Sequence, residues 1–174
     1  SGDNYSIKSA LLAKDADVVC AFDLESTSRV ETIFAFQTPI GVITPVDHPI
    51  ARLKEVTLAD CQPHPIIAPT EEWLNHSIIR ELINESAVPF QIAARVERIG
   101  MLKNLVQAGL GIAFISQTGI EDDIVQQRLA WTPFAEGVIK PTTISLLAPK
   151  GRVLMPYILS FIEMLKEELE ARAN

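Results

Sequence analysis

The sequence has few of the residues that build metal centres, disulfide scaffolds or nucleic-acid surfaces. Its 174 residues include two cysteines, three histidines and 15 lysines and arginines, against 22 aspartates and glutamates, which gives a formal net charge of −7. Phosphate binding requires a concentrated field of Lys and Arg. The acidic balance therefore argues against a nucleic-acid-binding surface in this stretch, and any DNA contact must come from elsewhere.

The cysteines and histidines are also too scattered to suggest a metal site. Cys20 lies in an apolar run and Cys61 ends a short segment, and neither has a CxxC partner or a histidine at metal-ligand spacing. We expect two reduced cysteines buried as small hydrophobes rather than a disulfide. His48, His64 and His76 form no HxxxH or HExxH pattern. We predict no metal and no cofactor.

The chain also lacks a membrane segment and the usual catalytic motifs. It has no run of about 18 apolar residues, and the opening letters SGDNYS do not resemble a signal peptide. A cytoplasmic location is the default, although a processed periplasmic protein would look the same. There is no GxSxG motif and no phosphate-binding glycine loop. We expect that the chain is not an enzyme. The alternative is a small hydrolase or transferase on the same scaffold, and slow turnover of a candidate ligand would favour it.

What the chain does have is apolar material in an alternating pattern of strands and helices. Hydrophobic residues make up 48% of it, enough for one sizeable core or two small ones. Residues 97–116 read as a helix that ends near Gly109 and leads into a buried strand at 112–115. Helices are expected at 3–14, 71–86, 118–125 and 155–171, with a single turn at 57–60. Strands are expected at 17–22, 31–37, 40–44, 65–69, 88–94, 129–133 and 142–147. The alternation indicates an α/β fold.

Three phrases carry a resemblance to a known family. They are LVQAGLGIA at 105–113, PVDHPIA at 45–51 and TLAD at 57–60, the last of which also fits a helix capping box. Together they resemble the effector-binding domain of LysR-type transcriptional regulators. The resemblance implies a two-lobed fold of the periplasmic-binding-protein type (type 2), with mixed sheets flanked by helices. Lobe I would comprise residues 1–43 and 141–174, and lobe II residues 44–140.

The resemblance also implies a function. The chain would be the effector-sensing and dimerising module of a DNA-binding regulator, holding a small, carboxylate-bearing molecule between the lobes. The alternative is a solute-binding protein of a transport system, which shares the fold. The family's domain normally opens with a strand, a helix and a second strand before the helix at 3–14, so we expect lobe I to be incomplete and the DNA-binding domain to be absent. An open sheet edge and the first helix favour a dimer or tetramer.

The ligand site is predicted from the positions of helix N-termini. In an open α/β sheet, ligands bind beyond the carboxyl ends of strands, where free helix amides favour an anion. Such places occur near residues 3–4, 69–71 and 97–98. The candidate ligand-binding residues are Asp3, Asn4, Phe22, Pro69, Thr70, Glu71, Glu97, Arg98 and Phe114.

These candidates do not carry equal weight. Arg98 can hold a carboxylate by a two-pronged hydrogen bond, and a salt bridge to a neighbouring Glu is an equal alternative. Family members often have a small polar residue where this chain has Glu97 and Arg98. The acidic residues are more often first-turn helix acids than ligand contacts, and Phe22 and Phe114 are more often core. Since the acids would repel a dianion, we predict a mono-anion or an amino-acid-like zwitterion.

Overall fold

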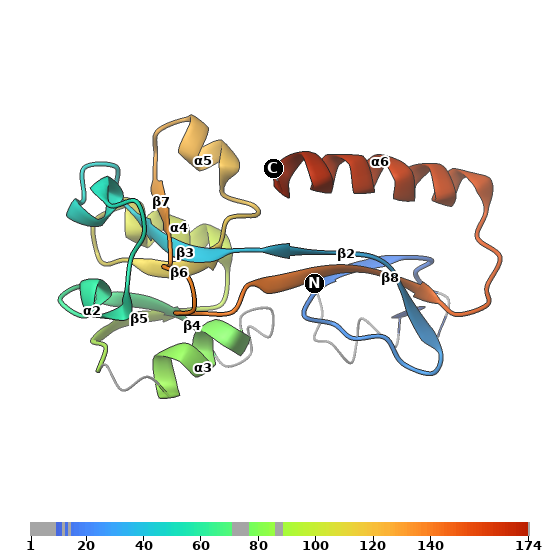
Figure 1. The fold of residues 1–174 in the computed structure, drawn as a ribbon, viewed down its shortest axis with the longest axis horizontal. Coiled ribbons are helices and arrows are strands. Elements are labelled where there is room, and N and C mark those ends of the chain that lie inside the picture. Colours follow the sequence, from blue (N-terminus) through green and yellow to red (C-terminus); the bar gives the residue numbers. More distant parts are fainter. Residues whose placement is uncertain (1–9, 12, 14, 71–76, 86–88, 174) are drawn as a thin grey trace. The chain divides into compact units, whose positions relative to one another are not determined.

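In the computed structural model the chain divides into two compact units (Figure 1). Unit 1 comprises residues 1–38 and 142–174, and unit 2 comprises residues 39–141. The structure describes residues 10, 11, 13, 15–70, 77–85 and 89–173. The expected helix at 3–14 therefore falls largely outside the described residues, apart from Ala10, Leu11 and Ala13, which are helical. The expected helix at 71–86 falls partly outside them, and its described part is α3, Ser77–Glu85.

Unit 1 is an antiparallel sheet with apolar contacts on both faces. The sheet has the order β1-β8-β2, with β1 at Val19–Phe22, β2 at Val30–Thr38 and β8 at Thr142–Pro149. Helix α6, Pro156–Ala173, contributes Ile158 and Ile162 to a cluster with Leu146. Leu147 belongs to a second cluster, with Leu11 and Leu24. Since neighbouring residues of a strand face opposite sides, both faces of the sheet are covered.

Three expectations for unit 1 need correction. The apolar run at 17–22 is typical of an inner strand of a parallel sheet, apolar on both faces, but in the described residues β1 pairs only with β8, in antiparallel orientation. Cys20 is exposed rather than buried, because alternate strand residues point away from the core. In α6, the spacing of Phe161 from Ile158 and Leu165 predicts a place in the buried stripe, yet Phe161 is 55% exposed. The buried stripe is therefore narrower than the sequence suggested.

Unit 2 contains a mixed sheet whose strands form two hydrogen-bonded groups. One has the order β6-β3-β7 and is antiparallel, and the other pairs β4 with β5 in parallel. The parallel bridge between Ile66 and Ile112 links the two groups. The strands are β3 Ile40–Thr44, β4 Ile66–Pro69, β5 Ile92–Val96, β6 Ala113–Ser116 and β7 Ala130–Pro133. Strand β3, expected in lobe I, thus pairs within unit 2.

Helices cover both faces of this sheet. They are η1 Pro49–Arg52, α2 Leu58–Cys61, α3, α4 Ile99–Gln107 and α5 Glu121–Val125. Ile66 packs with residues of η1, α2 and α3, whereas its neighbour Ile67 packs with Leu102 and Val106 of α4. Alternation along the strand therefore divides the core into two apolar layers, one on each side of the sheet.

Several local predictions for unit 2 are confirmed. The Thr57 hydroxyl accepts from the Asp60 amide at 3.4 Å, and the Asp60 carboxylate accepts from the Thr57 amide at 2.8 Å, which completes the capping box. Helix α4 ends at Gly109, whose φ is +75°. Leu110 N–H donates to Leu105 O and Gly109 N–H to Val106 O, the bond pair of a Schellman motif. Strand β5, predicted from residue 88, begins only at Ile92, after Pro89, which has no amide proton.

Candidate functional site

The carboxyl ends of β4 and β5 bring three of the predicted site residues together in unit 2. Pro69 lies opposite Val96 in this parallel pair. The Thr70 amide then donates to the Val96 carbonyl at 2.9 Å. Thr70 is therefore next to Glu97 and Arg98, although these two residues follow it by 27 and 28 positions in the sequence. This group, Thr70, Glu97 and Arg98, is called the β4–β5 edge below.

The Thr70 hydroxyl is an unusual feature of this edge. Its Oγ1 is buried and has no hydrogen-bond partner among the described residues. Leaving a buried hydroxyl unsatisfied costs about 1–3 kcal/mol, and such groups are rare in native proteins. An acceptor or donor on a ligand at this edge would remove that cost.

The edge also carries the N-terminus of α4. Arg98 is the N-cap residue, with an extended backbone (φ −135°, ψ 137°), and its side chain makes no cap hydrogen bond. An arginine side chain has no acceptor atom and cannot fill this role. The first turn also contains no acidic residue. In the described part of the chain, the amides at the start of the helix therefore have no side-chain cap, and their partial positive charge suits an anion.

Arg98 itself remains available to a ligand. Its side chain is exposed and forms no ion pair with any residue in the described part of the chain. The salt bridge to a neighbouring glutamate, left open by the sequence, is not found there. Glu97 is also exposed. The β4–β5 edge thus combines a guanidinium, an uncapped helix N-terminus and an unsatisfied hydroxyl with one carboxylate.

The other predicted site residues lie elsewhere or outside the described residues. Pro69 is buried, and its carbonyl accepts from Arg95 Nη1 at 3.4 Å. Phe114 is 2% exposed and packs edge-on against Phe90 and Phe134, so it belongs to the core, the alternative that the sequence left open. Phe22 is half-buried in β1 of unit 1. Asp3, Asn4 and Glu71 lie outside the described residues.

Sequence reasoning missed a second polar site, in unit 1. Residues 23–28 lie between two predicted strands and include none of the candidate site residues, yet four of them help to line a hollow of about 420 Å³ together with side chains of β2 and β8. The signal that could have found it is the sequence Asp-Leu-Glu-Ser at 23–26, which places two acids directly after a strand. The β2 and β8 contributions could not be read from the sequence, since they depend on strand register.

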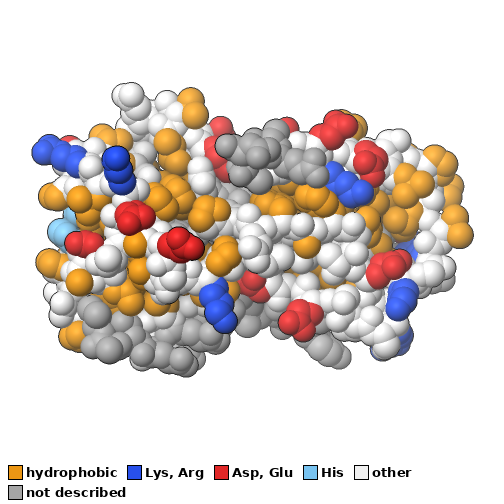
Figure 2. Space-filling view, in the orientation of Figure 1, with side chains coloured by type: hydrophobic (Ala, Val, Ile, Leu, Met, Phe, Trp, Pro, Cys, Tyr) orange, Lys and Arg blue, Asp and Glu red, His pale blue; other side chains and the backbone are white. Residues whose placement is uncertain are grey.

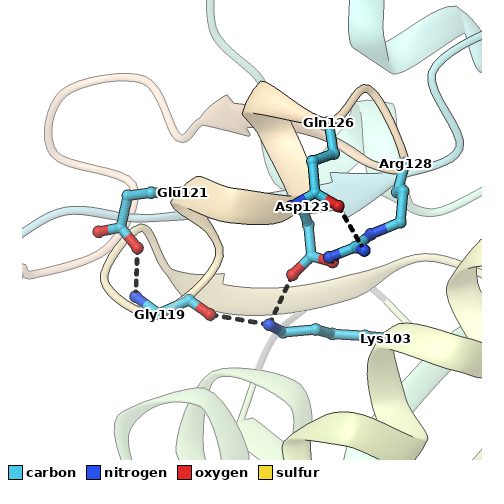
Figure 3. Close-up of polar contacts among 6 residues, drawn as sticks. All are labelled: Lys103, Gly119, Glu121, Asp123, Gln126 and Arg128. Carbon is cyan, nitrogen blue, oxygen red and sulfur yellow. Dashed lines mark hydrogen bonds and ion pairs between the residues drawn. The ribbon is translucent and has the colours of Figure 1, made fainter.

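Unit 2 also contains a charged network that stabilises the start of α5 (Figure 3). Lys103 Nζ on α4 lies 2.6 Å from Asp123 Oδ2 and donates to the Gly119 carbonyl at 2.8 Å. Arg128 Nη2 lies 2.7 Å from Asp123 Oδ1. Asp123 is 8% exposed. Burial alone would raise the pKa of Asp123, but the hydrogen bonds and charges of the two cations outweigh it, and the pKa lies below its ordinary value. This network is structural, because its groups satisfy one another.

His48, His64 and Cys61 also have structural roles. His48 Nδ1 accepts from the Ile50 amide at 3.2 Å and caps η1, and its ring lies 4.5 Å from that of His64. Burial and the charge of His64 lower the pKa of His48, against a smaller raising effect of Asp47. Cys61 is buried, and burial with the charge of Asp60 raises the pKa of its thiol to about 12. That thiol is therefore protonated and unreactive at neutral pH.

No helix in the described part of the chain is long and apolar enough to cross a membrane. On the face shown in Figure 2, lysine and arginine side chains are scattered among acidic and apolar ones rather than gathered in one field.

Known proteins resemble this chain in sequence and in fold. The sequence profile of the LysR substrate binding domain matches residues 1–170. A probable RuBisCO transcriptional regulator of Emiliania huxleyi is 29% identical over 129 residues, covering 72% of this chain and 41% of the relative. The chain spans about two fifths of the length of the curated relatives that it matches first.

Two solved structures show the same fold at lower identity. The effector binding domain of QuiR in complex with shikimate has a TM-score of 0.71 and 18% identity, covering 93% of this chain and 76% of that one. The regulatory domain of Synechocystis PCC6803 CcmR in complex with 2-PG also has a TM-score of 0.71, with 16% identity, covering 94% and 78%. At this identity the likeness concerns the fold alone, which is the two-lobed, type 2 periplasmic-binding-protein-like fold predicted from the sequence.

Proposed function

Because the chain belongs to the family of LysR substrate-binding domains, we propose that it is the effector-binding domain of a DNA-binding transcriptional regulator. In this proposal the domain binds a small molecule and does not catalyse a reaction. The DNA-binding segment lies in another part of a cytoplasmic protein. Regulators among its relatives support this assignment over a transport protein.

The single observation that supports an effector site best is the β4–β5 edge. The guanidinium of Arg98 stands at the uncapped N-terminus of α4, and the buried Thr70 Oγ1 lacks a partner among the described residues. A carboxylate placed there accepts from Arg98 and from the helix amides, and it also accepts from the Thr70 hydroxyl. Glu97 opposes a second negative charge and favours a cationic group on the same ligand. The effector is therefore a mono-anion or a zwitterion.

The expected energies are sufficient for measurable binding. A helix N-terminus contributes about 0.3–1 kcal/mol to an exposed anion, and more when partly enclosed. A hydrogen bond to a charged group contributes about 1.5–3 kcal/mol. Asp3, Asn4 and Glu71 remain proposed contacts, and the placement of the effector between the two lobes remains the family-based prediction.

Calorimetric titration of the chain with small acids, amines and zwitterions tests this site. The panel includes shikimate and 2-phosphoglycolate, because the QuiR and CcmR structures contain them. For the best carboxylate, Arg98→Ala should weaken binding by about tenfold or more, the equivalent of one charge-assisted hydrogen bond. Thr70→Val, which removes the hydroxyl and keeps the shape, should weaken it by about threefold to tenfold.

The matched control is Arg52→Ala, which removes another exposed arginine of unit 2, at the end of η1. This variant should bind the carboxylate as the unchanged chain does. A neutral or purely cationic compound as the best binder would contradict the proposed site. So would a carboxylate whose affinity is the same for Arg98→Ala and Arg52→Ala.

The regulator assignment has its own tests. We propose that the protein assembles as a dimer or tetramer, as LysR-type regulators do, and sedimentation that shows only monomer at micromolar protein would contradict this. The complete coding sequence should contain an in-frame helix-turn-helix segment before residue 1. A full-length protein without such a segment, or one that binds no DNA, would remove the regulator assignment but would leave the ligand site to be judged by calorimetry.

A further inference from the structure

The hollow in unit 1 is lined almost entirely by hydrogen-bond acceptors and hydroxyls. Its volume of about 420 Å³ lies within the usual range for small-molecule sites. The loop after β1 contributes the carboxylates of Asp23 and Glu25. Hydroxyls come from that loop and from β2 and β8, namely Ser26, Thr32, Thr143 and Ser145. None of the described residues that line it is a lysine or an arginine.

Asp23 is held in place before any ligand arrives. Its φ is +48°, a left-handed conformation that is uncommon outside glycine. Three bonds to β8 fix it: the Asp23 amide donates to the Thr143 carbonyl at 2.7 Å, and its carboxylate accepts from Thr142 Oγ1 at 2.7 Å and from the Thr143 amide at 2.8 Å. Each carboxylate oxygen then has one lone pair left. The carboxylate is therefore positioned and can accept further hydrogen bonds.

Ser145 supplies an independent sign that the hollow takes a ligand. It is 5% exposed and lines the hollow. Within the described residues its hydroxyl forms no side-chain hydrogen bond, and it is not one of the fully buried unsatisfied oxygens, so it is open to the hollow. A polar ligand in the hollow would give it a hydrogen-bond partner.

We propose that this hollow binds a small organic cation, an alkylammonium or alkylguanidinium. The N–H groups of the cation donate to the carboxylates of Asp23 and Glu25, and Ser145 Oγ accepts from the same group. Leu24 and Ala35, which also line the hollow, contact its alkyl part. Anions are repelled by the two carboxylates. The proposal is independent of the proposed effector site, because every residue in it belongs to unit 1.

The test titrates the 174-residue chain with butylguanidinium and with butylurea, a neutral molecule of nearly the same shape. Backbone amide shifts in NMR spectra locate the site, and their concentration dependence gives the affinity. Butylguanidinium should shift the amides of Thr143 and Ser145 saturably below about 10 mM, a range that corresponds to weak but specific binding. Butylurea should produce no saturable shift at these amides.

Three variants assign the binding to named groups. Asp23→Asn removes the charge but keeps a residue that tolerates a left-handed backbone, and it should weaken butylguanidinium binding about tenfold. Glu25→Gln, at an exposed position, should weaken it about twofold to fivefold. Ser145→Ala should weaken it about threefold. Glu31→Gln is the matched control, an exposed acid of β2 that does not line the hollow, and it should change nothing.

The remaining outcomes overturn the proposal. It fails if butylguanidinium shifts no amide of β8, if butylurea binds equally well, or if the Asp23→Asn, Glu25→Gln double variant binds like the control. Spectra of each variant without ligand show whether the fold is retained. Should Asp23→Asn disturb the spectrum, Glu25→Gln and Ser145→Ala decide the question alone. Loss of carboxylate binding at Arg98 would not affect any of these results.

Discussion

The two units present opposite hydrogen-bonding character at their polar sites. Among the described residues, the hollow of unit 1 offers carboxylates and hydroxyls and no cationic side chain, whereas the β4–β5 edge of unit 2 offers a guanidinium and helix amides without a side-chain cap. In both units the decisive residues lie just after a strand, Asp23 directly after β1 and Arg98 two residues after the end of β5. The few residues at the end of a strand therefore determine whether the site favours an anionic or a cationic ligand, and the sheet positions those residues.

The units also differ in how they use charge for stability. Unit 2 buries Asp123 between two cations. In unit 1 the ion pairs Arg152–Asp17 and Lys166–Glu163 lie nearer the surface. Exposed pairs contribute little because water and salt screen them. Substitutions that remove an ion pair should therefore change the free energy of unfolding more in unit 2 than in unit 1. Both tryptophans lie in the residue range of unit 2, so tryptophan fluorescence reports on that unit.

The largest effect is expected for Gly111→Ala, at the link between the two strand groups of unit 2. A Cβ at this position would lie 2.5 Å from the Pro65 carbonyl oxygen, which accepts from the Ile112 amide. Because the Pro65 backbone cannot move aside as a flexible side chain would, and Ile67 Cδ1 lies 3.3 Å away, the substitution should lower the free energy of unfolding by about 2–3 kcal/mol. Denaturant unfolding followed by tryptophan fluorescence measures it.

The control for this substitution is Gly100→Ala, whose added Cβ meets nothing within 4 Å. Alanine should stabilise α4 slightly there, by up to about 1 kcal/mol. If the comparison of the units holds, Gly111→Ala leaves hydrogen exchange of the β8 amides unchanged. Equal stability of the two glycine variants would show that the approach of Gly111 to Pro65 is not tight.

Asp123→Asn should come next, with a loss of about 1–2 kcal/mol, because it removes the charge that pairs with Lys103 and Arg128. The effect should depend on pH. Since the native pKa of Asp123 is lowered, its contribution is present above the ordinary pKa near 4 and is lost as pH falls through the native value. Unfolding free energies measured at several pH values between about 7 and 3 should thus converge for the two proteins. A difference in unfolding free energy that stays the same at every pH would show that the charge of Asp123 is not what stabilises the network.

His48→Ala should cost less, about 0.5–1 kcal/mol, the usual value of a helix cap. The lowered pKa of His48 means that the folded protein favours the neutral ring. The cap therefore stabilises above the ordinary pKa near 6.5 and is lost as pH falls through the native value. His48→Asn, which can cap without titrating, should retain stability at neutral pH and flatten the pH dependence. An Asn variant as unstable as the Ala variant would exclude the capping role.

Lys166→Met in unit 1 should have the smallest effect, below about 0.5 kcal/mol, because it breaks an exposed pair with Glu163 at i, i+3. The methionine keeps most of the apolar stem. Thermal unfolding at low and high salt should give nearly the same midpoint difference from the unchanged chain. A loss as large as that of Asp123→Asn would show that the two units do not differ in their use of ion pairs.

Local patterns with a direct physical cause could be predicted from the sequence. The capping box at Thr57 and the helix end at Gly109 follow from short-range hydrogen bonds and from backbone sterics, and both are confirmed. Glu97 and Arg98 were placed correctly before α4 for the same reason. Their neighbour Thr70 was singled out as well, although its unsatisfied hydroxyl depends on packing that no sequence pattern records.

Features that depend on register and on long-range pairing could not be predicted. The antiparallel pairing of β1 with β8 joins residues more than a hundred positions apart. It exposes Cys20 and places Ser145 with Asp23 and Glu25 around one hollow. Likewise, the assignment of β3 to unit 2 follows from its pairing with β6 and β7 rather than from its own residues. Apolar content alone also could not tell that Phe161 faces outward.

The most direct test of the account is a crossed titration of two ligands against two variants. The best carboxylate from the calorimetric panel and butylguanidinium are each titrated against the unchanged chain, Arg98→Ala and Glu25→Gln. The account predicts that Arg98→Ala weakens only the carboxylate, by about tenfold, and that Glu25→Gln weakens only the guanidinium, by about twofold to fivefold. Equal weakening of both ligands by either variant would contradict it. So would a carboxylate that Arg98→Ala does not weaken together with a guanidinium that Glu25→Gln does not weaken.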